Sequence, residues 1–190
     1  MTPGHRDPDS RGEATLATIP PVDDSDDGVR GQQLIGATLH AELLRRGQTL
    51  ATAESMTGGA LADLVSASPG ASETYLGGVV SYATEIKVRT LGVRPETVDE
   101  EGVVSETCAV EMATGVRALI GADWGVSTTG VAGPATQEGK PVGTVYVAVA
   151  GPRGVRTEEL HLDGDRAEIR ERTCTAAATM VLEDVKAGAG

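Results

Sequence analysis

The sequence contains no phenylalanine, and only one tryptophan and three tyrosines among its 190 residues. A hydrophobic core must therefore be built from aliphatic side chains and packed with small residues. The two cysteines, Cys108 and Cys174, form no CxxC motif and no disulfide framework, a pattern typical of reduced thiols in a cytoplasmic protein. No apolar run reaches the roughly 20 residues that a membrane span needs, and residues 1–12 lack the apolar segment of a signal peptide.

Basic residues are also scarce. The chain has 16 Lys and Arg against 28 Asp and Glu, which gives a net charge of −12. Proteins that bind nucleic acids or anionic membranes need clustered positive charge, so neither partner is expected. The length suits one domain with a tail rather than two large domains.

Residues 1–30 differ in composition from the rest of the chain. They contain four prolines and four aspartates clustered within residues 23–27, and they show no apolar periodicity. Such a segment buries too little apolar surface to offset the entropy lost on ordering. We therefore predict a disordered acidic and proline-rich tail over residues 1–30, followed by one domain over residues 31–188.

Within that domain, helical and strand patterns mostly alternate. Helical spacing of apolar residues predicts helices that begin near residues 32, 61, 86, 105 and 169. The helix capped by Ser105 is expected to bury Cys108, Met112, Val116 and Leu119. Short apolar runs predict strands over residues 49–53, 75–82, 124–129, 142–150 and 155–162, of which the last two form a hairpin. This order predicts an α/β fold, a three-layer α/β/α sandwich with a mixed sheet in a single domain.

Residues 52–61 join a buried strand to a helix and are the most informative stretch. Ligands of open α/β sheets gather at the carboxyl ends of strands, where a helix N-terminus offers free N–H groups to an anion. Gly58 and Gly59 allow the backbone to approach a ligand closely, and Ser55 is presented at that edge. Two interpretations remain equally open: Ser55 is a nucleophile, or Ser55 or Thr57 only caps the helix.

A serine nucleophile needs a base, and the histidines are poorly placed. His5 lies in the tail, His40 lies within a helix, and His161 shares a polar strand face. Lys87 follows the carboxyl end of the strand over 75–82, and it reaches Ser55 if that strand neighbours the first. A lysine acts as a base only when burial lowers its pKa, and a solvated Lys87 is the alternative.

A third loop completes the candidate site. Residues 127–134 leave the strand over 124–129, and residues 140–144 follow shortly after. Their small residues leave room for a ligand, and their hydroxyl and N–H groups offer hydrogen bonds. An ordinary glycine-rich connection is the alternative, since no Walker motif is present.

Taken together, these stretches resemble the CinA C-terminal domain family, the nicotinamide mononucleotide amidases of the PncC type. The resemblance covers roughly residues 32–186 in order and without large insertions. The matching pieces are TAESMTGG at 52–59, GVVSYA at 78–83 with Lys87, LGV at 91–93, GVVS at 102–105, TGVAGP at 129–134, KPVG at 140–143, and GDR at 164–166 with Arg170.

The resemblance implies a three-layer α/β/α fold and hydrolysis of the carboxamide of nicotinamide mononucleotide to nicotinate mononucleotide and ammonia. It implies Ser55 as nucleophile, Lys87 as base and Tyr82 as a third catalytic residue, with no metal or organic cofactor. A small nucleotide is the expected partner, and a homo-oligomer is compatible with the resemblance. The expected substrate-binding residues are Thr57, Gly58, Gly59, Thr129, Gly130, Ala132, Gly133, Arg166 and Arg170.

Two of these expectations have alternatives. Arg166 and Arg170 either bind the substrate phosphate or form surface salt bridges. Residues 135–139 stand where the family usually carries a slightly longer glycine-rich run. A catalytically silent relative that binds a nucleotide or a protein, and a serine amidase acting on another small amide, are therefore the competing functions.

Overall fold

Five strands form one mixed sheet in the order β2-β1-β3-β4-β5, in a computed structural model that describes residues 27–188. β1, β2 and β3 are parallel to one another, whereas β4 pairs antiparallel with β3 and β5 pairs antiparallel with β4. The strands are β1 (Leu50–Glu54), β2 (Tyr75–Val80), β3 (Trp124–Gly130), β4 (Thr144–Gly151) and β5 (Gly154–His161).

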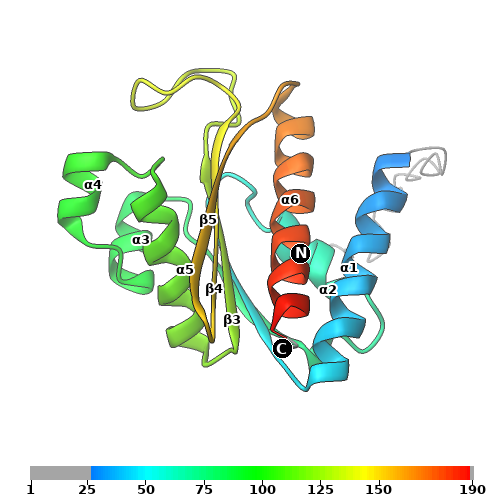
Figure 1. Ribbon diagram of the computed structural model, residues 1–190. Helices are drawn as coiled ribbons and strands as arrows, with labels where there is room; N and C mark the ends of the chain where they lie inside the picture. The colour runs from blue at the N-terminus through cyan, green and yellow to red at the C-terminus, as the bar shows by residue number, and fades with distance from the viewer. Residues whose placement is uncertain (1–26, 189–190) are drawn as a thin grey trace, which may run out of the picture.

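Helices cover both faces of the sheet, as Figure 1 shows. One face carries α1 (Asp27–Arg46), α2 (Ala60–Ser66) and α6 (Arg166–Ala187). The other face carries α3 (Thr84–Leu91), α4 (Pro95–Glu101) and α5 (Glu106–Ile120), and a short 3₁₀ turn, η1 (Ala71–Glu73), precedes β2. The predicted three-layer α/β/α sandwich with a mixed sheet in a single domain is confirmed. Within residues 27–188, no helix is both long and apolar enough to cross a bilayer.

The core is aliphatic, as the absence of phenylalanine requires. Leu, Val, Ala and Met side chains fill both faces, and glycines let elements approach closely. A Cβ on Gly115 of α5 would lie 1.8 Å from the carbonyl oxygen of Leu91 in α3. A Cβ on Gly125 of β3 would lie 2.3 Å from the carbonyl oxygen of Ala113. These contacts seat α5 against both α3 and the sheet.

The parallel register brings three chain segments together at one edge of the sheet. Glu54, the last residue of β1, pairs with Val80 of β2 and Thr128 of β3. The residues that follow these strands therefore emerge side by side: Ser55 after β1, the segment 81–87 after β2, and residues 131–134 after β3. Because β4 runs antiparallel to β3, the loop over residues 131–143 also lies at this edge (Figure 1).

Several local predictions need correction. α1 begins at Asp27 rather than at residue 32, because its first turns are polar and show no apolar pattern. Residues 27–30 of the predicted tail therefore belong to this helix. Residues 1–26 of the predicted tail lie outside the described residues. α4 was not expected, since its sequence PETVDEE has a single apolar residue. Leu119 is 55% exposed, because the buried stripe of α5 continues from Val116 to Ile120 instead.

Candidate functional site

Ser55 lies in a tight turn between β1 and α2. Its N–H group donates to the carbonyl of Thr128 at 3.0 Å, which extends the β1–β3 ladder by one residue. Its own carbonyl accepts from the N–H group of Gly58 at 3.1 Å, closing a turn over residues 55–58. Gly58 and Gly59 have φ angles of 61° and 103°, a left-handed conformation that glycine adopts without steric strain. The chain can therefore enter α2 immediately after presenting the serine.

The helix that follows is capped by Glu54 rather than by a hydroxyl. The fully buried Glu54 carboxylate accepts from the N–H groups of Gly59, Leu61 and Ala62 at 2.9, 3.0 and 2.8 Å. The Thr57 hydroxyl instead pairs with that of Thr128 at 2.7 Å. Ser55 and Thr57 thus do not cap α2, and the serine hydroxyl is left for another partner.

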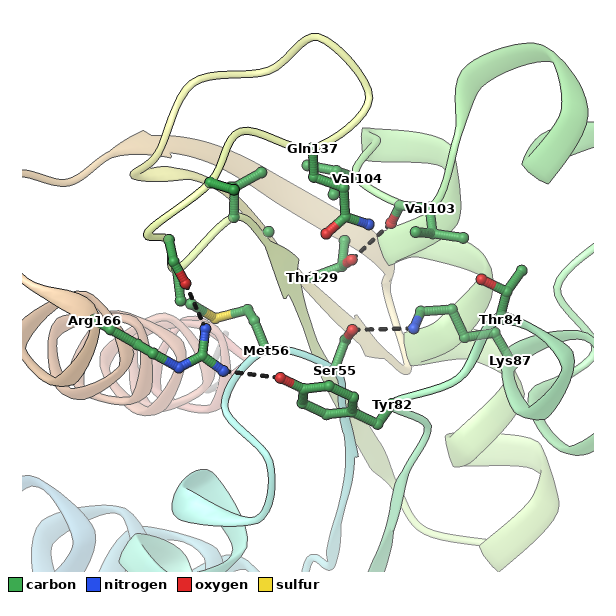
Figure 2. A pocket seen from close by; sticks show the side chains of 15 residues that line it. Ser55, Met56, Tyr82, Thr84, Lys87, Val103, Val104, Thr129, Gln137 and Arg166 are labelled. Atoms are coloured by element: carbon green, nitrogen blue, oxygen red, sulfur yellow. Dashed lines mark hydrogen bonds between the residues drawn. The ribbon is translucent and has the colours of Figure 1, made fainter.

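That partner is Lys87, as the sequence predicted if β1 and β2 were neighbours. Its Nζ lies 3.0 Å from Ser55 Oγ (Figure 2). The same Nζ donates to the carbonyl of Ser81 at 2.6 Å. The side chain is 1% exposed, which excludes the solvated alternative. A buried amine in contact with a serine hydroxyl can take the hydroxyl proton if it is neutral.

Burial lowers the pKa of Lys87, because an ammonium loses its hydration there; nearby Cys108 and Glu138 oppose this shift. Burial also raises the pKa of Cys108 to about 11, so at neutral pH its thiol carries no charge. Desolvation thus shifts Lys87 toward the neutral amine that a general base requires.

The turn after Ser55 also exposes backbone donors. Gly58 N–H is bonded to Ser55 and Gly59 N–H to Glu54, so neither is free to bind a ligand. In the part of the chain that the structure describes, the N–H groups of Met56 and Thr57 donate to no acceptor. Adjacent free N–H groups beside a nucleophile are the donors that stabilise a developing oxyanion. Of these two residues Met56 lines the pocket and Thr57 does not, so the N–H group of Met56 is the candidate oxyanion donor.

The Ser55 hydroxyl and the Lys87 amine line one pocket, which is partly open to solvent. Arg166, at the start of α6, donates to the carbonyl of Gly133 and to the hydroxyl of Tyr82, both at 2.8 Å. It thereby bridges the segments that follow β2 and β3 (Figure 2). Thr129 donates to the carbonyl of Val103 at 2.6 Å and joins a third segment to the wall.

The structure brings most of the predicted site residues together. Those that line the pocket are Ser55, Tyr82, Lys87, Thr129, Gly130, Ala132, Gly133 and Arg166. Four do not line it: Thr57, Gly58, Gly59 and Arg170. Arg170 donates to the carbonyl of Thr57 at 2.5 Å, so it supports the turn that carries Ser55.

Seven further residues line the pocket that are not among the catalytic and substrate-binding residues named from the sequence. They are Met56, Thr84, Val103, Val104, Val131, Ala135 and Gln137. Val103 and Val104 belong to the GVVS motif at 102–105, which could have pointed to them; Gln137 lies in a loop without a periodic pattern. Among the described residues, no three His, Cys, Asp or Glu side chains gather in an arrangement that could hold a metal ion.

The fold and the pocket define a class: a three-layer α/β protein with a serine and a buried lysine paired at the carboxyl ends of adjacent parallel strands. The chain belongs to the CinA C-terminal domain family, which it matches over residues 32–185.

Known proteins agree with this membership. A CinA-like protein of Frankia casuarinae is 50% identical over 139 residues, which cover 73% of this chain and 32% of the relative. A CinA-like protein of Synechocystis is 45% identical over 137 residues, which cover 71% of this chain and 33% of the relative. The chain therefore spans about a third of the length of these curated relatives.

Solved structures extend the match to the fold. A CinA superfamily protein from Klebsiella pneumoniae has a TM-score of 0.80 at 34% identity, over 82% of this chain and 98% of its own. A CinA superfamily protein from Escherichia coli has a TM-score of 0.78 at 30% identity, and the match covers 87% of this chain and 94% of that protein.

Proposed function

We propose that this protein is an amidase that hydrolyses the carboxamide of nicotinamide mononucleotide to nicotinate mononucleotide and ammonia. The observation that carries the proposal is the 3.0 Å contact between Ser55 Oγ and the Nζ of the buried Lys87. The resemblance of the site motifs to the amidases of this family supplies the substrate. The free, buried thiols of Cys108 and Cys174 support a cytoplasmic location for this activity.

The geometry suits a two-step acyl transfer. Ser55 Oγ attacks the carboxamide carbon while Lys87 Nζ takes the hydroxyl proton, and the carbonyl oxygen becomes an oxyanion facing the Met56 N–H group. The C–N bond then breaks, and Lys87 returns the proton to the leaving nitrogen, which departs as ammonia. An ester of Ser55 remains.

Water completes the cycle. Lys87 takes a proton from a water molecule, which attacks the ester carbon, and the Ser55–acyl bond breaks. The proton returns to Ser55, and the carboxylic acid product is released and ionises. The protein's own serine, lysine and backbone N–H groups account for each proton and bond in this sequence.

Arg166 supports a substrate that carries a phosphate. Arg166 and Lys87 are the two cationic side chains that line the pocket. Arg166 lies in the first turn of α6 and is exposed, whereas Lys87 is buried. A guanidinium matches the oxygens of a phosphate through paired hydrogen bonds. Its hydrogen bond to Tyr82 supports a role for Tyr82 in orienting Arg166. Within the described residues, the N–H groups of Ala132 and Gly133 donate to no acceptor and offer further donors, whereas that of Val131 donates to the carbonyl of Thr144.

The direct test measures ammonia released from nicotinamide mononucleotide and, separately, from nicotinamide. We expect turnover of the nucleotide with a kcat/KM at least about tenfold above that of the free base, since only the nucleotide engages Arg166. Turnover of other small amides with no preference for the nucleotide would instead favour a serine amidase of different specificity. Binding of the nucleotide without turnover would favour a silent relative.

A further inference from the structure

A short loop over residues 134–141 borders the pocket and lies above Ser55 and Lys87 in Figure 2. Gln137 and Lys140 exchange backbone hydrogen bonds, from Gln137 N at 3.3 Å and from Lys140 N at 2.8 Å. Glu138 and Gly139, at the tip between them, have φ angles of 52° and 73°. Ala135 and Gln137 line the pocket, whereas Thr136 does not. The loop therefore presents alternate residues to the cavity.

Glu138 fastens this loop to the opposite wall. Its carboxylate accepts from the N–H groups of Val103 and Val104 at 3.1 and 2.9 Å, and both valines line the pocket. The preceding residue, Gly102, leaves room for that carboxylate: a Cβ there would lie 2.2 Å from Glu138 Oε2. A hydrogen bond to an ionised group is about twice as strong as a neutral one, so this clamp fixes the tip of the loop.

The clamp determines where Gln137 points. Figure 2 shows the side chain of Gln137 descending from the loop, with its amide beside Thr129 on the pocket side. Gln137 is an exposed residue of the pocket lining, and within the described residues its amide makes no hydrogen bond to the protein, so its donor and acceptor are free for a ligand. A side-chain amide carries an N–H₂ donor and a carbonyl acceptor, the complement of the same two groups in a carboxamide.

We propose that Gln137 is a specificity residue that binds the substrate carboxamide, and that Glu138 is the positioning residue that holds Gln137 over Ser55 and Lys87. The identity of the carboxamide rests on the proposed function. Gln137 Oε1 accepts from the substrate –NH₂ group, which distinguishes an amide from a carboxylate product. The shortened loop thereby retains a recognition element for the substrate.

The test compares Gln137→Met, which keeps the size of the side chain and removes its hydrogen bonds, with the unmodified protein. For nicotinamide mononucleotide we expect KM to rise about tenfold with kcat nearly unchanged. In a Ser55→Ala background, calorimetry should show about tenfold weaker binding of the same nucleotide in Gln137→Met, and no comparable change for nicotinate mononucleotide. Glu138→Ala should raise KM similarly, with partial recovery in Glu138→Gln, which keeps one acceptor oxygen.

Thr136→Ala is the matched control, since it lies in the same loop outside the pocket lining and should leave KM and binding unchanged. If Gln137→Met changes neither KM nor the dissociation constant by more than twofold, the assignment of Gln137 is overturned and the proposed function is unaffected. If the nucleotide binds through Gln137 but wild type releases no ammonia, the proposed function fails and the assignment stands. Absence of nucleotide binding to the Ser55→Ala protein overturns the assignment as well.

Discussion

Replacing Ser55 with alanine is expected to lower ammonia release from nicotinamide mononucleotide by about 10⁴-fold or more, because the attacking oxygen is lost. The fold should persist, since Lys87 keeps its hydrogen bond to the Ser81 carbonyl and α2 keeps its Glu54 cap. Steady-state ammonia assays and a thermal melt on the same preparation would check both halves of this prediction.

The matched control is Ser66→Ala at the exposed end of α2, where the hydroxyl donates only to the carbonyl of Asp63. This variant should retain the wild-type rate. A Ser55→Ala protein within tenfold of wild type would remove the nucleophile from the proposed reaction.

The second large effect is expected at Lys87. Lys87→Met fills much of the same buried space without a basic nitrogen, and it should lower kcat by about 10²–10⁴-fold, the usual contribution of a general base. Lys87→Arg should lose a similar factor, because a guanidinium does not release its proton at accessible pH. The wild-type kcat/KM should rise with pH through the lowered pKa of Lys87, since only the neutral amine accepts the serine proton.

Lys186→Met on the exposed end of α6 is the corresponding control and should leave the pH–rate profile unchanged. A Lys87→Arg protein with the full rate would show that the base lies elsewhere. Circular dichroism on each variant separates loss of the base from loss of the fold.

The sequence predicted the contact of Ser55 with Lys87 on the condition that β1 and β2 are neighbours, and the family resemblance implied the roles of the two residues. Alternating helices and strands indicate a parallel arrangement, and the carboxyl ends of neighbouring parallel strands meet at one edge. Ser55 follows β1 and Lys87 follows β2, so the adjacency of these strands brings the two side chains together. Their predicted contact needed no knowledge of side-chain detail.

The finer substrate contacts depended on hydrogen bonds that join distant segments. Gly58 and Gly59 were expected to bind substrate, but their N–H groups are bonded to Ser55 and Glu54. Arg166 and Arg170 are one helical turn apart, yet only Arg166 lines the pocket, because Arg170 reaches back to Thr57. A periodic pattern shows which face of a helix a residue occupies, but it does not show which hydrogen-bond partner the side chain has.

The covering loop shows the same limit. Its residues have no apolar period, and the clamp joins Glu138 to Val103 and Val104 across more than thirty positions of the chain. The sequence therefore indicated a loop of altered length, whereas its role in lining the pocket emerged from the structure. α4 was missed for a related reason, since a short polar helix has little apolar periodicity to detect.

The central claim is that Lys87 is an amine of lowered pKa beside the Ser55 hydroxyl. The chain has only three lysines, Lys87, Lys140 and Lys186, so ¹³C-labelled lysine gives a simple NMR spectrum that can be followed through a pH titration. The signal that disappears in Lys87→Arg assigns Lys87. We predict that this signal titrates clearly below the ordinary lysine pKa of about 10.4. Titration at or above that value would contradict the proposed role of Lys87 as the base.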